Sequence, residues 1–468
     1  MKRNFQNIRL PDPDSASGLA VCALSALLLW GVEWALRGWW EPDEARFVYI
    51  SREMFETGSW LLPMRHGVPY PDKPPLMMWL IALGERLFPA HFGSRLPLWI
   101  GATLALRSVW SIGNLWRGRA AGALAAILLA ASFQMSASMG LGQIDGLLIG
   151  LQLAGLRSML LRRGFVEPGV WFGLAVLAKG PVGLAVPLGV WAAIRLAEGR
   201  RPGPRAFLRV ATVSILSTVP VSAWLIAARS LAGAPDDWLR DILFSQTVER
   251  AAGSVGGHRH GPLYFIPHLA TQFLPWVPFL PRAFAFLRSR DKLMFRRTAA
   301  WIAFVALFFS IPVCKRNVYI LMTVPGMALA LASAWPDALP LGLRGRAARV
   351  LAAAVAFFAL ANACKPLLNS RKTPAPMAAL AAKHIPGKDG RLLLFNMRGE
   401  TLALHANRRG LRCDDDASLK SAMAGEGHGL AVFGKKAATN LVERFPAFSG
   451  RPSGSFKMGR KEFEWVAF

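Results

Sequence analysis

Acidic and basic side chains with catalytic potential stand at a few points in a sequence that is otherwise rich in apolar residues. The stretch EPDEARF places Asp43 and Arg46 close together, and YPDKPP places Asp72 next to Lys73. The other such residues are Asp145 in GQIDGLL, Lys179 in LAKGP, Arg250 in VERAAG, His258 and His260 in GGHRHGP, and Lys315 and Tyr319 in CKRNVYI. A carboxylate can take a proton from a hydroxyl group while Lys and Arg stabilise a departing phosphate. If these residues lie close together in the fold, they predict a reaction in which a group is transferred to a hydroxyl and a phosphate leaves.

The composition indicates that the elements positioning these residues are membrane helices. The chain has 468 residues, of which 53% are hydrophobic and 18% charged, and its mean hydropathy is +0.33. Apolar runs close to the length of a bilayer crossing recur along it, which predicts an all-α polytopic membrane protein. The first run, Gly18 to Leu36, is long and lacks a small-residue cleavage site, so we interpret it as an anchor helix and not as a signal peptide.

The formal net charge of +27 does not indicate a nucleic-acid partner. Much of the Lys and Arg excess lies in short loops between apolar runs, the pattern that keeps loops on the cytoplasmic side of a membrane. These loops are Arg117/Arg119, Arg162/Arg163, Arg195 to Arg209, Arg288 to Arg297 and Arg344 to Arg349. The four cysteines show no spacing typical of disulfides or of a metal site.

Placing every cationic loop inside, with the N-terminus, predicts about eleven membrane crossings. The expected spans are 18–36, 95–116, 120–138, 144–161, 169–179, 181–197, 207–229, 263–287, 298–313, 318–334 and 349–364. Lys179-Gly180-Pro181 separates two short spans that can form a broken pair. Pro75 to Phe88 is too short for a crossing, so we expect an interfacial helix there.

This alternation brings the candidate residues to one face, the outer one. The outer segments are 38–75, the turn around Asp145, 230–262, 315–317 and everything after about residue 365. Ionisable groups at membrane depth are costly and are functional candidates by default. A carboxylate base beside a cationic cradle at this surface would suit a phosphate carried on a lipid that enters sideways from the bilayer. Lys315 and Tyr319, four residues apart, would share a face if a helix begins there.

We expect the chain to divide into a transmembrane catalytic domain, 1–365, and a small α/β domain on the outer face, 366–468. RLLLFNM, GLAVFG and KEFEWVAF are typical of short strands, and KKAATNLVERF between them of a helix. The excess of basic residues suits an anionic lipid surface or a polyanionic glycan, and equally a basic soluble domain with no such partner.

Six motifs in order carry a family resemblance: EPDEARF, YPDKPPL, GQIDGLL, LAKGPVGL, VERAAGSVGGHRHGPLYFIP and FFSIPVCKRNVYIL. Across residues 18–335 the chain resembles the GT-C class of membrane glycosyltransferases. More narrowly, it is similar to the bacterial aminoarabinose lipid A transferases and the protein O-mannosyltransferases. The resemblance weakens in the C-terminal domain, and the chain is shorter than the aminoarabinose transferases.

The resemblance implies an inverting transfer of a sugar from a polyprenyl-phosphate donor on the periplasmic side. It makes Asp43 the base that activates the acceptor and Asp145 a second catalytic carboxylate that orients the acceptor or the base. It assigns the donor phosphate to Lys73, and it places further residues around the phosphate or the sugar. These are Arg46, Arg250, Lys315 and Tyr319.

Several of these residues also have a structural interpretation. Asp43 can form a surface ion pair with Arg46, and Asp145 can cap the helix that follows it. We interpret Lys179 as a residue at the break between the two short spans whose side chain extends so that its ammonium group lies at the membrane surface. Glu44 is interpreted as structural, paired with Arg46 or Arg52.

The resemblance requires no cofactor, although a divalent metal has a place in this neighbourhood in relatives. Asp72, His258 and His260 are the candidate ligands. The spacing of these residues does not establish a site, and loop histidines without a metal are the alternative.

The expected partners are a polyprenyl-phosphate-sugar donor, a lipid or glycan acceptor and membrane lipids. Lipid A or another envelope glycan is favoured as acceptor, and a protein Ser or Thr remains open. Two rival functions remain as well. A transporter or flippase for lipid-linked sugars would share the helices and the cationic pocket, but its polar groups would lie at mid-bilayer. A non-catalytic assembly partner would not need Asp43 and Lys73.

Overall fold

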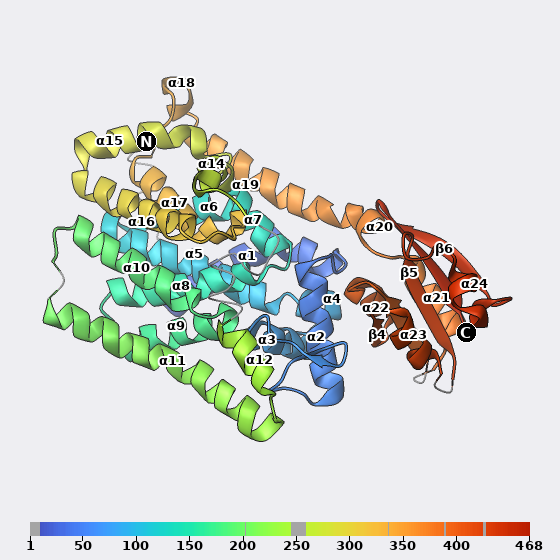
Figure 1. Cartoon of the computed structure of the whole chain (residues 1–468). Coiled ribbons are helices and arrows are strands. Elements are labelled where there is room, and N and C mark those ends of the chain that lie inside the picture. The colour runs from blue at the N-terminus through green and yellow to red at the C-terminus, as the bar shows by residue number, and fades with distance from the viewer. Residues whose placement is uncertain (1–9, 202, 245–258, 336, 388–389, 425–426) are drawn as a thin grey trace. The chain divides into compact units, whose positions relative to one another are not determined.

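The structure is a computed structural model that describes residues 10–201, 203–244, 259–335, 337–387, 390–424 and 427–468 (Figure 1). The chain forms two compact units. The helical unit comprises Met1–Ala35, Pro71–Leu80 and Arg95–Ala363. The sheet-containing unit comprises Leu36–Tyr70, Ile81–Ser94 and Cys364–Phe468. The segment that carries Asp43 therefore belongs to the same unit as the C-terminal residues.

The helical unit is built mainly from α-helices and short 3₁₀ turns (Figure 1). Apart from single terminal residues, its α-helices are α1 (Ala16–Leu36), α5 (Leu96–Arg117), α6 (Arg119–Ala130), α7 (Phe133–Gly140), α8 (Ile144–Leu160), α9 (Val166–Lys179), α10 (Val182–Ala197), α11 (Pro204–Ala232), α12 (Asp236–Arg240), α14 (Phe265–Gln272), α15 (Leu280–Arg290), α16 (Lys292–Ser310), α17 (Thr323–Ser333), α18 (Leu341–Arg344) and α19 (Ala347–Cys364). The 3₁₀ turns are η2 (Pro262–Tyr264), η3 (Val277–Phe279) and η4 (Asn317–Met322). Helix α3 (Leu76–Leu87) begins in this unit, and its residues from Ile81 onward belong to the other.

Helices α5 and α8 lie in close contact because glycines face each other between them. A Cβ atom added to Gly101 of α5 would lie 2.2 Å from the carbonyl oxygen of Gly146 in α8. One added to Gly150 would lie 2.3 Å from the carbonyl oxygen of Gly101. Small residues allow such close backbone approach between membrane helices. This contact fixes the first turn of α8, which contains Asp145.

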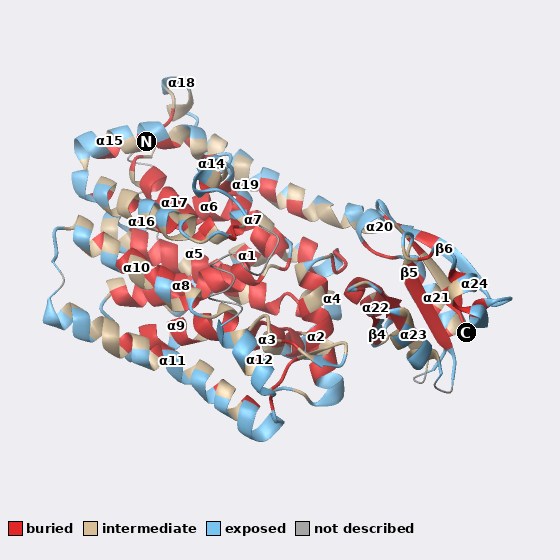
Figure 2. Cartoon of the chain, viewed as in Figure 1, coloured by how far each residue is buried: buried red, intermediate tan, exposed pale blue. Residues whose placement is uncertain are grey.

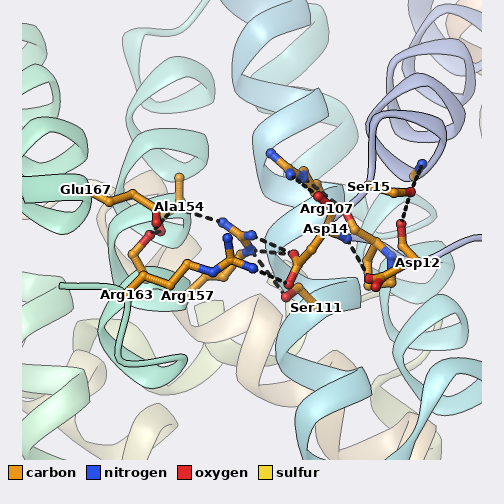
Figure 3. Close-up of polar contacts among 12 residues, drawn as sticks. Asp12, Asp14, Ser15, Arg107, Ser111, Ala154, Arg157, Arg163 and Glu167 are labelled. Atoms are coloured by element: carbon orange, nitrogen blue, oxygen red, sulfur yellow. Dashed lines mark hydrogen bonds and ion pairs between the residues drawn. The ribbon is translucent and has the colours of Figure 1, made fainter.

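The N-terminal segment is tied to the helical bundle by ion pairs (Figure 3). Arg157 of α8 donates to Asp14 at 2.6 Å and to Glu167 at 3.3 Å. Arg163 also contacts Asp14, at 3.1 Å. Burial opposes ionisation of Asp14, but the hydrogen bond and charge of Arg157 outweigh it, so the pKa of this carboxyl lies below its ordinary value. The segment before α1 is thus bonded to α8.

Within the described residues, four helices are long and apolar enough to cross a membrane, namely α1, α11, α16 and the run from Ala347 to Lys372. The pair α6 and α7, bent by 60°, would make a fifth. Figure 2 shows buried residues concentrated on α5, α8 and α17, whereas much of α11 is exposed. Because Ile215, Val219 and Ile226 of α11 are exposed and apolar, this surface suits contact with lipid tails.

Two expected crossings are not single straight helices. The span 120–138 bends between α6 and α7, and 263–287 is divided among η2, α14, η3 and α15. Pro275 and Pro278 lie at the second interruption, where each lacks the N–H that a continuing helix requires. The prediction of one unbroken helix over 263–287 is therefore wrong, whereas the predicted break at Lys179-Gly180-Pro181 is confirmed between α9 and α10.

The sheet-containing unit centres on a five-stranded sheet of order β4-β3-β5-β7-β6. Strands β4, β3 and β5 are parallel, and β7 pairs antiparallel with both β5 and β6. Its strands and helices are α2 (Asp43–Thr57), β1 (Met64–Arg65), β2 (Val68–Pro69), α4 (Ala90–Gly93), η5 (Lys365–Leu368), α20 (Asn369–Lys372), α21 (Pro376–His384), β3 (Arg391–Phe395), α22 (Glu400–Ala406), β4 (Gly410–Cys413), α23 (Asp416–Met423), β5 (Gly429–Gly434), α24 (Leu441–Arg444), η6 (Pro446–Phe448), β6 (Ser453–Met458) and β7 (Lys461–Ala467). Phe395, Phe433, Phe445 and Phe448 form much of its core.

Buried polar contacts join α2 to the C-terminal part of this unit. The Tyr49 hydroxyl donates to the carbonyl oxygen of Gly410 at 3.2 Å. Glu53, 1% exposed, accepts hydrogen bonds from the backbone N–H groups of His66 and Gly67 at 2.8 and 2.7 Å and from Arg409 at 3.1 Å. A buried carboxylate is stable only when it is bonded in this way. These contacts position α2, whose first residue is Asp43.

The predicted C-terminal strands are present as β3, β5 and β7. Strands β4 and β6 were not predicted. The helix expected over KKAATNLVERF is wrong for most of its length, because only Leu441–Arg444 is helical and a turn precedes it.

Candidate active site

The geometry of the α8–α9 hairpin brings Asp145 and Lys179 together. Asp145 lies in the first turn of α8, and Lys179 is the last residue of α9. The two helices pack side by side and are joined by residues 161–165. The open end of the hairpin therefore carries one residue of each sign, and the Lys179 ammonium forms an ion pair with the Asp145 carboxylate.

This ion pair corrects two interpretations of the sequence. Asp145 does not cap α8, since the N-cap position is Gln143 and no side chain caps the helix. Lys179 does not simply extend toward the membrane surface, because its ammonium binds Asp145 and lies 5.1 Å from the centre of the Tyr319 ring. Each charge also suits its helix end, with the acid in a first turn and the base in a last turn.

The ion pair lines a cavity of about 280 Å³ that lies wholly within the helical unit. Lys73, Gln152 and Tyr319 contribute the other large polar side chains of its wall. Gln152 also donates to the carbonyl oxygen of Val182 at 2.8 Å, which joins α8 to the start of α10. The remaining wall is mostly apolar and includes Leu148, Ile149, Val186, Phe308 and Phe309. Cationic groups and an extended apolar surface thus meet in one cavity.

Lys73 reaches this cavity from the segment before α3. Its ammonium donates to the carbonyl oxygen of Asp72 at 2.7 Å, and the side chain is partly exposed. Lys73 and Lys179, which are far apart in the sequence, contribute to the same wall.

Lys315 and Tyr319 do not share a helical face as expected. Lys315 lies in a loop, because η4 begins only at Asn317 and is a 3₁₀ helix. The Lys315 side chain is buried, and its ammonium donates to the carbonyl oxygens of His260 and Pro312. Tyr319 and the neighbouring Cys314 line the cavity, whereas Lys315 is not among its wall residues.

Asp43 and Arg46 lie in α2 of the sheet-containing unit and form an ion pair of 2.7 Å. The structural interpretation of Asp43 is therefore observed. Glu44 pairs with neither Arg46 nor Arg52. Its partner is Arg37, at 2.8 Å, and both side chains are almost completely buried.

Two of the predicted site residues, Arg250 and His258, lie outside the described residues. The ring of His260 stacks on Tyr264 with centroids 4.1 Å apart. The described residues contain no cluster of three His, Cys, Asp or Glu side chains suited to a metal ion. The proposed trio of Asp72, His258 and His260 includes an undescribed member, so it stays a prediction.

The arrangement can bind a phosphate attached to a long apolar chain. Lys73 and Lys179 provide positive charge, and Asp145 balances part of it before a ligand arrives. The apolar wall can hold several methylene or isoprene groups at a gain of about 0.8 kcal/mol for each buried CH₂. Lys179 and Gln152 are the polar residues of this cavity that sequence reasoning missed as site residues. Residues 145 and 179 are separated from the 161–165 turn by nearly equal numbers of residues. In an antiparallel hairpin this places them side by side, so the ion pair could have been predicted.

The sequence is similar to families of lipid-dependent glycosyltransferases. The profile of the family described as dolichyl-phosphate-mannose-protein mannosyltransferase matches residues 72–224, which include Lys73, Asp145 and Lys179. The undecaprenyl phosphate-alpha-4-amino-4-deoxy-L-arabinose arabinosyl transferase of Enterobacter sp. (strain 638) is 29% identical over 336 residues, covering 68% of this chain and 59% of the relative. The enzyme of the same name from Aeromonas salmonicida (strain A449) is 29% identical over 329 residues, covering 66% and 58%. The chain thus spans about three fifths of the length of these curated relatives.

Solved structures show that the fold is shared. ArnT from Cupriavidus metallidurans bound to undecaprenyl phosphate superposes with a TM-score of 0.76 at 20% identity, covering 97% of this chain and 98% of that one. The archaeal oligosaccharyltransferase AglB from Archaeoglobus fulgidus has a TM-score of 0.54 at 14% identity, covering 89% and 69%. The predicted similarity to GT-C glycosyltransferases is confirmed, as is a helical polytopic fold with a small C-terminal α/β part.

Proposed function

We propose that this chain is an inverting glycosyltransferase of the bacterial inner membrane that moves a sugar from a polyprenyl-phosphate donor to a periplasmic acceptor. The observation that carries the proposal is the cavity in which Lys73 and Lys179 border an apolar wall. That combination suits a lipid phosphate, which needs cationic and apolar surface side by side. The similarity to transferases whose names specify undecaprenyl phosphate supports this donor class.

The proposed reaction is a single displacement at the anomeric carbon of the donor sugar. An acceptor hydroxyl oxygen forms a bond to this carbon while the bond to the phosphate oxygen breaks. Asp43 takes the acceptor proton, and Asp145 acts as the second carboxylate by holding Lys179 at the cavity. Polyprenyl phosphate leaves as an anion, so no strong acid is needed. Preorganised positive charge at the leaving oxygen is worth several kcal/mol in such reactions.

The donor phosphate and sugar would be held by the basic residues and Tyr319. Lys73 and Tyr319 line the cavity, and Lys315 would act from its buried position beside the wall. Arg46 and Arg250 complete the proposed set. The displacement is balanced without a cofactor, and Asp72, His258 and His260 remain the candidate ligands should a divalent metal bind.

A lipid or glycan acceptor, with lipid A first, fits the proposal best. Named relatives transfer 4-amino-4-deoxy-L-arabinose, so the undecaprenyl phosphate conjugate of this sugar is the first donor to test. The N-terminus would face the cytoplasm and the C-terminal residues the periplasm, following the distribution of cationic loops.

The test is a transfer assay with the purified full chain in lipid nanodiscs. Undecaprenyl phosphate-aminoarabinose and lipid A are supplied, and mass spectrometry follows both lipids. The expected result is lipid A heavier by one sugar residue, with release of undecaprenyl phosphate. A parallel assay in vesicles measures donor movement between leaflets. The proposal would be contradicted if the donor moved between leaflets while its glycosidic bond stayed intact with every acceptor class supplied. That result would favour a flippase.

A further inference from the structure

A second cavity, here called the arginine cavity, lies at the other end of the α8–α9 hairpin. Its volume is about 870 Å³, and its wall includes Leu160 at the end of α8 and Phe165 just before α9. Leu160 is separated from Asp145 by most of α8, about 22 Å at 1.5 Å per residue. The two cavities share no wall residue. The arginine cavity is therefore a separate site within the helical unit.

Positive charge dominates the arginine cavity. Glu198 is the one carboxylate of its wall among the described residues, and it pairs with Arg297 at 2.8 Å and with Arg200 at 3.3 Å. The wall thus has an excess of five positive charges. The arginines are Arg162, Arg195, Arg200, Arg205, Arg209 and Arg297. Like charges gathered around one cavity repel each other, so an anion bound there would be stabilised.

Arg209 provides the clearest sign of a missing partner. Its Nε and Nη2 atoms are buried, yet neither has a hydrogen-bond partner among the residues that the structure describes. Burying an N–H donor of a charged group without a hydrogen-bond acceptor costs free energy. A ligand oxygen that accepts from these atoms would therefore bind favourably. The Arg209 guanidinium lies 5.7 Å from the centre of the Phe165 ring, so its position is supported by an aromatic contact.

Aromatic side chains support two further guanidinium groups of the cavity. Arg195 lies 4.9 Å from the centre of the Trp191 ring, and Arg297 lies 5.1 Å from that of Trp116. A guanidinium held over an aromatic ring can still donate from its edge to phosphate oxygens, although Arg297 already uses its Nε and Nη2 atoms on Glu198. Leu115, Leu160 and Leu208 add apolar surface beside these cations.

We propose that the arginine cavity binds the phosphate group of an anionic ligand. Its place at the helix ends, beside the lipid-facing surface of α11, fits the headgroup of an anionic phospholipid. A soluble phosphate would offer the same oxygens, and the two sources are separated by experiment. This inference does not depend on the proposed transfer reaction.

The first test measures binding to the purified full chain in a neutral detergent by calorimetry. Dioctanoyl phosphatidylglycerol is the probe, dioctanoyl phosphatidylcholine is the lipid without net charge, and inorganic phosphate is the soluble anion. We expect phosphatidylglycerol to bind, phosphatidylcholine not to bind, and Arg209→Gln to weaken binding about tenfold, as loss of a charged hydrogen bond implies. Arg346→Gln removes one exposed cation outside the cavity and should change affinity less than about twofold.

The competing source is read from the same titrations. Displacement of phosphatidylglycerol by inorganic phosphate at equal affinity supports the proposal and identifies a soluble phosphate as sufficient. Binding of the lipid alone supports it and identifies the headgroup. Equal affinities of the wild type and Arg209→Gln for both probes would overturn it, as would the absence of binding to either.

Thermal unfolding separates a ligand contact from a structural contact. Without ligand, Arg209→Gln should unfold at or above the wild-type temperature, because it removes one of several mutually repelling charges. Phosphatidylglycerol should raise the unfolding temperature of the wild type more than that of Arg209→Gln. The increase for Arg209→Lys should lie between the two. Arg209 would have a purely structural role if Arg209→Gln unfolded at a lower temperature than the wild type without lipid, and if lipid raised both unfolding temperatures equally. That result would contradict the proposal.

Discussion

Lys179 and Asp145 form an ion pair across the open end of the α8–α9 hairpin, and both residues line the cavity assigned to the donor. The pair arises from simple geometry, since residues 161–165 join two antiparallel helices of similar length. Gly101, Gly146 and Gly150 then hold α8 against α5. The Lys179–Asp145 pair is thus placed by helix packing.

The stability of this pair can be measured with a double-mutant cycle. Asp145→Asn and Lys179→Gln should each lower the free energy of unfolding, by about 3 kcal/mol when one buried charge is left without its partner. The double variant should lose less than the sum of the two, with a coupling of about 1–3 kcal/mol. Denaturant or thermal unfolding in detergent provides the measurement. Strictly additive losses would mean that the two side chains do not interact.

Loss of Lys73 should weaken donor use. Lys73→Ala removes a cation from the cavity wall, so both the affinity for undecaprenyl phosphate and the transfer rate should fall, with kcat/KM decreasing about 10- to 100-fold. Steady-state kinetics and binding of undecaprenyl phosphate check this. Lys436→Ala, at an exposed position of the sheet-containing unit, is the matched control and should leave both values unchanged. Unaltered kinetics in Lys73→Ala would remove its proposed role.

Glu53 should be essential to the stability of the sheet-containing unit. Glu53→Gln weakens three hydrogen bonds to a nearly inaccessible carboxylate and leaves Arg409 without its ion pair, so we expect a loss of about 2–3 kcal/mol. Glu56→Gln, one turn further along α2 at an exposed position, should change stability by less than about 0.5 kcal/mol. Hydrogen exchange of β4 and α2 measures the effect. Equal protection in both variants would be inconsistent with this role.

His66 predicts a loss of stability in acid. Burial lowers the pKa of His66 below its ordinary value of 6.5, although the hydrogen bond to Gly410 opposes the shift. The unfolded chain then binds a proton more readily than the folded one, so stability falls as the pH drops below about 6.5. His66→Asn, which tolerates the left-handed backbone at this position, should flatten the profile between about pH 7 and 5. His428→Asn, at an exposed histidine, should keep the wild-type slope.

Sequence reasoning predicted the helical elements well where apolar periodicity was strong. The spans 207–229 and 349–364 correspond closely to α11 and α19, and the Gly180-Pro181 break is where α9 ends and α10 begins. It failed over 263–287, where prolines interrupt an apolar run. Strand β4 was missed because GLRC is short and lacks alternation, and it exists through its pairing with β3.

The candidate site was predicted in part. Lys73, Asp145 and Tyr319 were selected from the sequence, and all three line one cavity. The partner of Glu44 was assigned wrongly. Arg37 lies in the turn between α1 and α2, and the fold of this turn brings it to Glu44. Lys315 could not be placed by its spacing to Tyr319, since the chain between them begins as an extended loop. Local patterns identify residue types, whereas tertiary packing decides their partners.

The most direct test of the account is the activity of Asp43→Asn in the nanodisc assay. The account predicts that kcat falls by about 100-fold or more, the usual contribution of a general base, while the affinity for undecaprenyl phosphate and the unfolding temperature stay near wild type. Glu56→Gln, on the same helix, should retain full activity. Full transfer activity in Asp43→Asn would contradict the proposal that this carboxylate takes the proton of the acceptor.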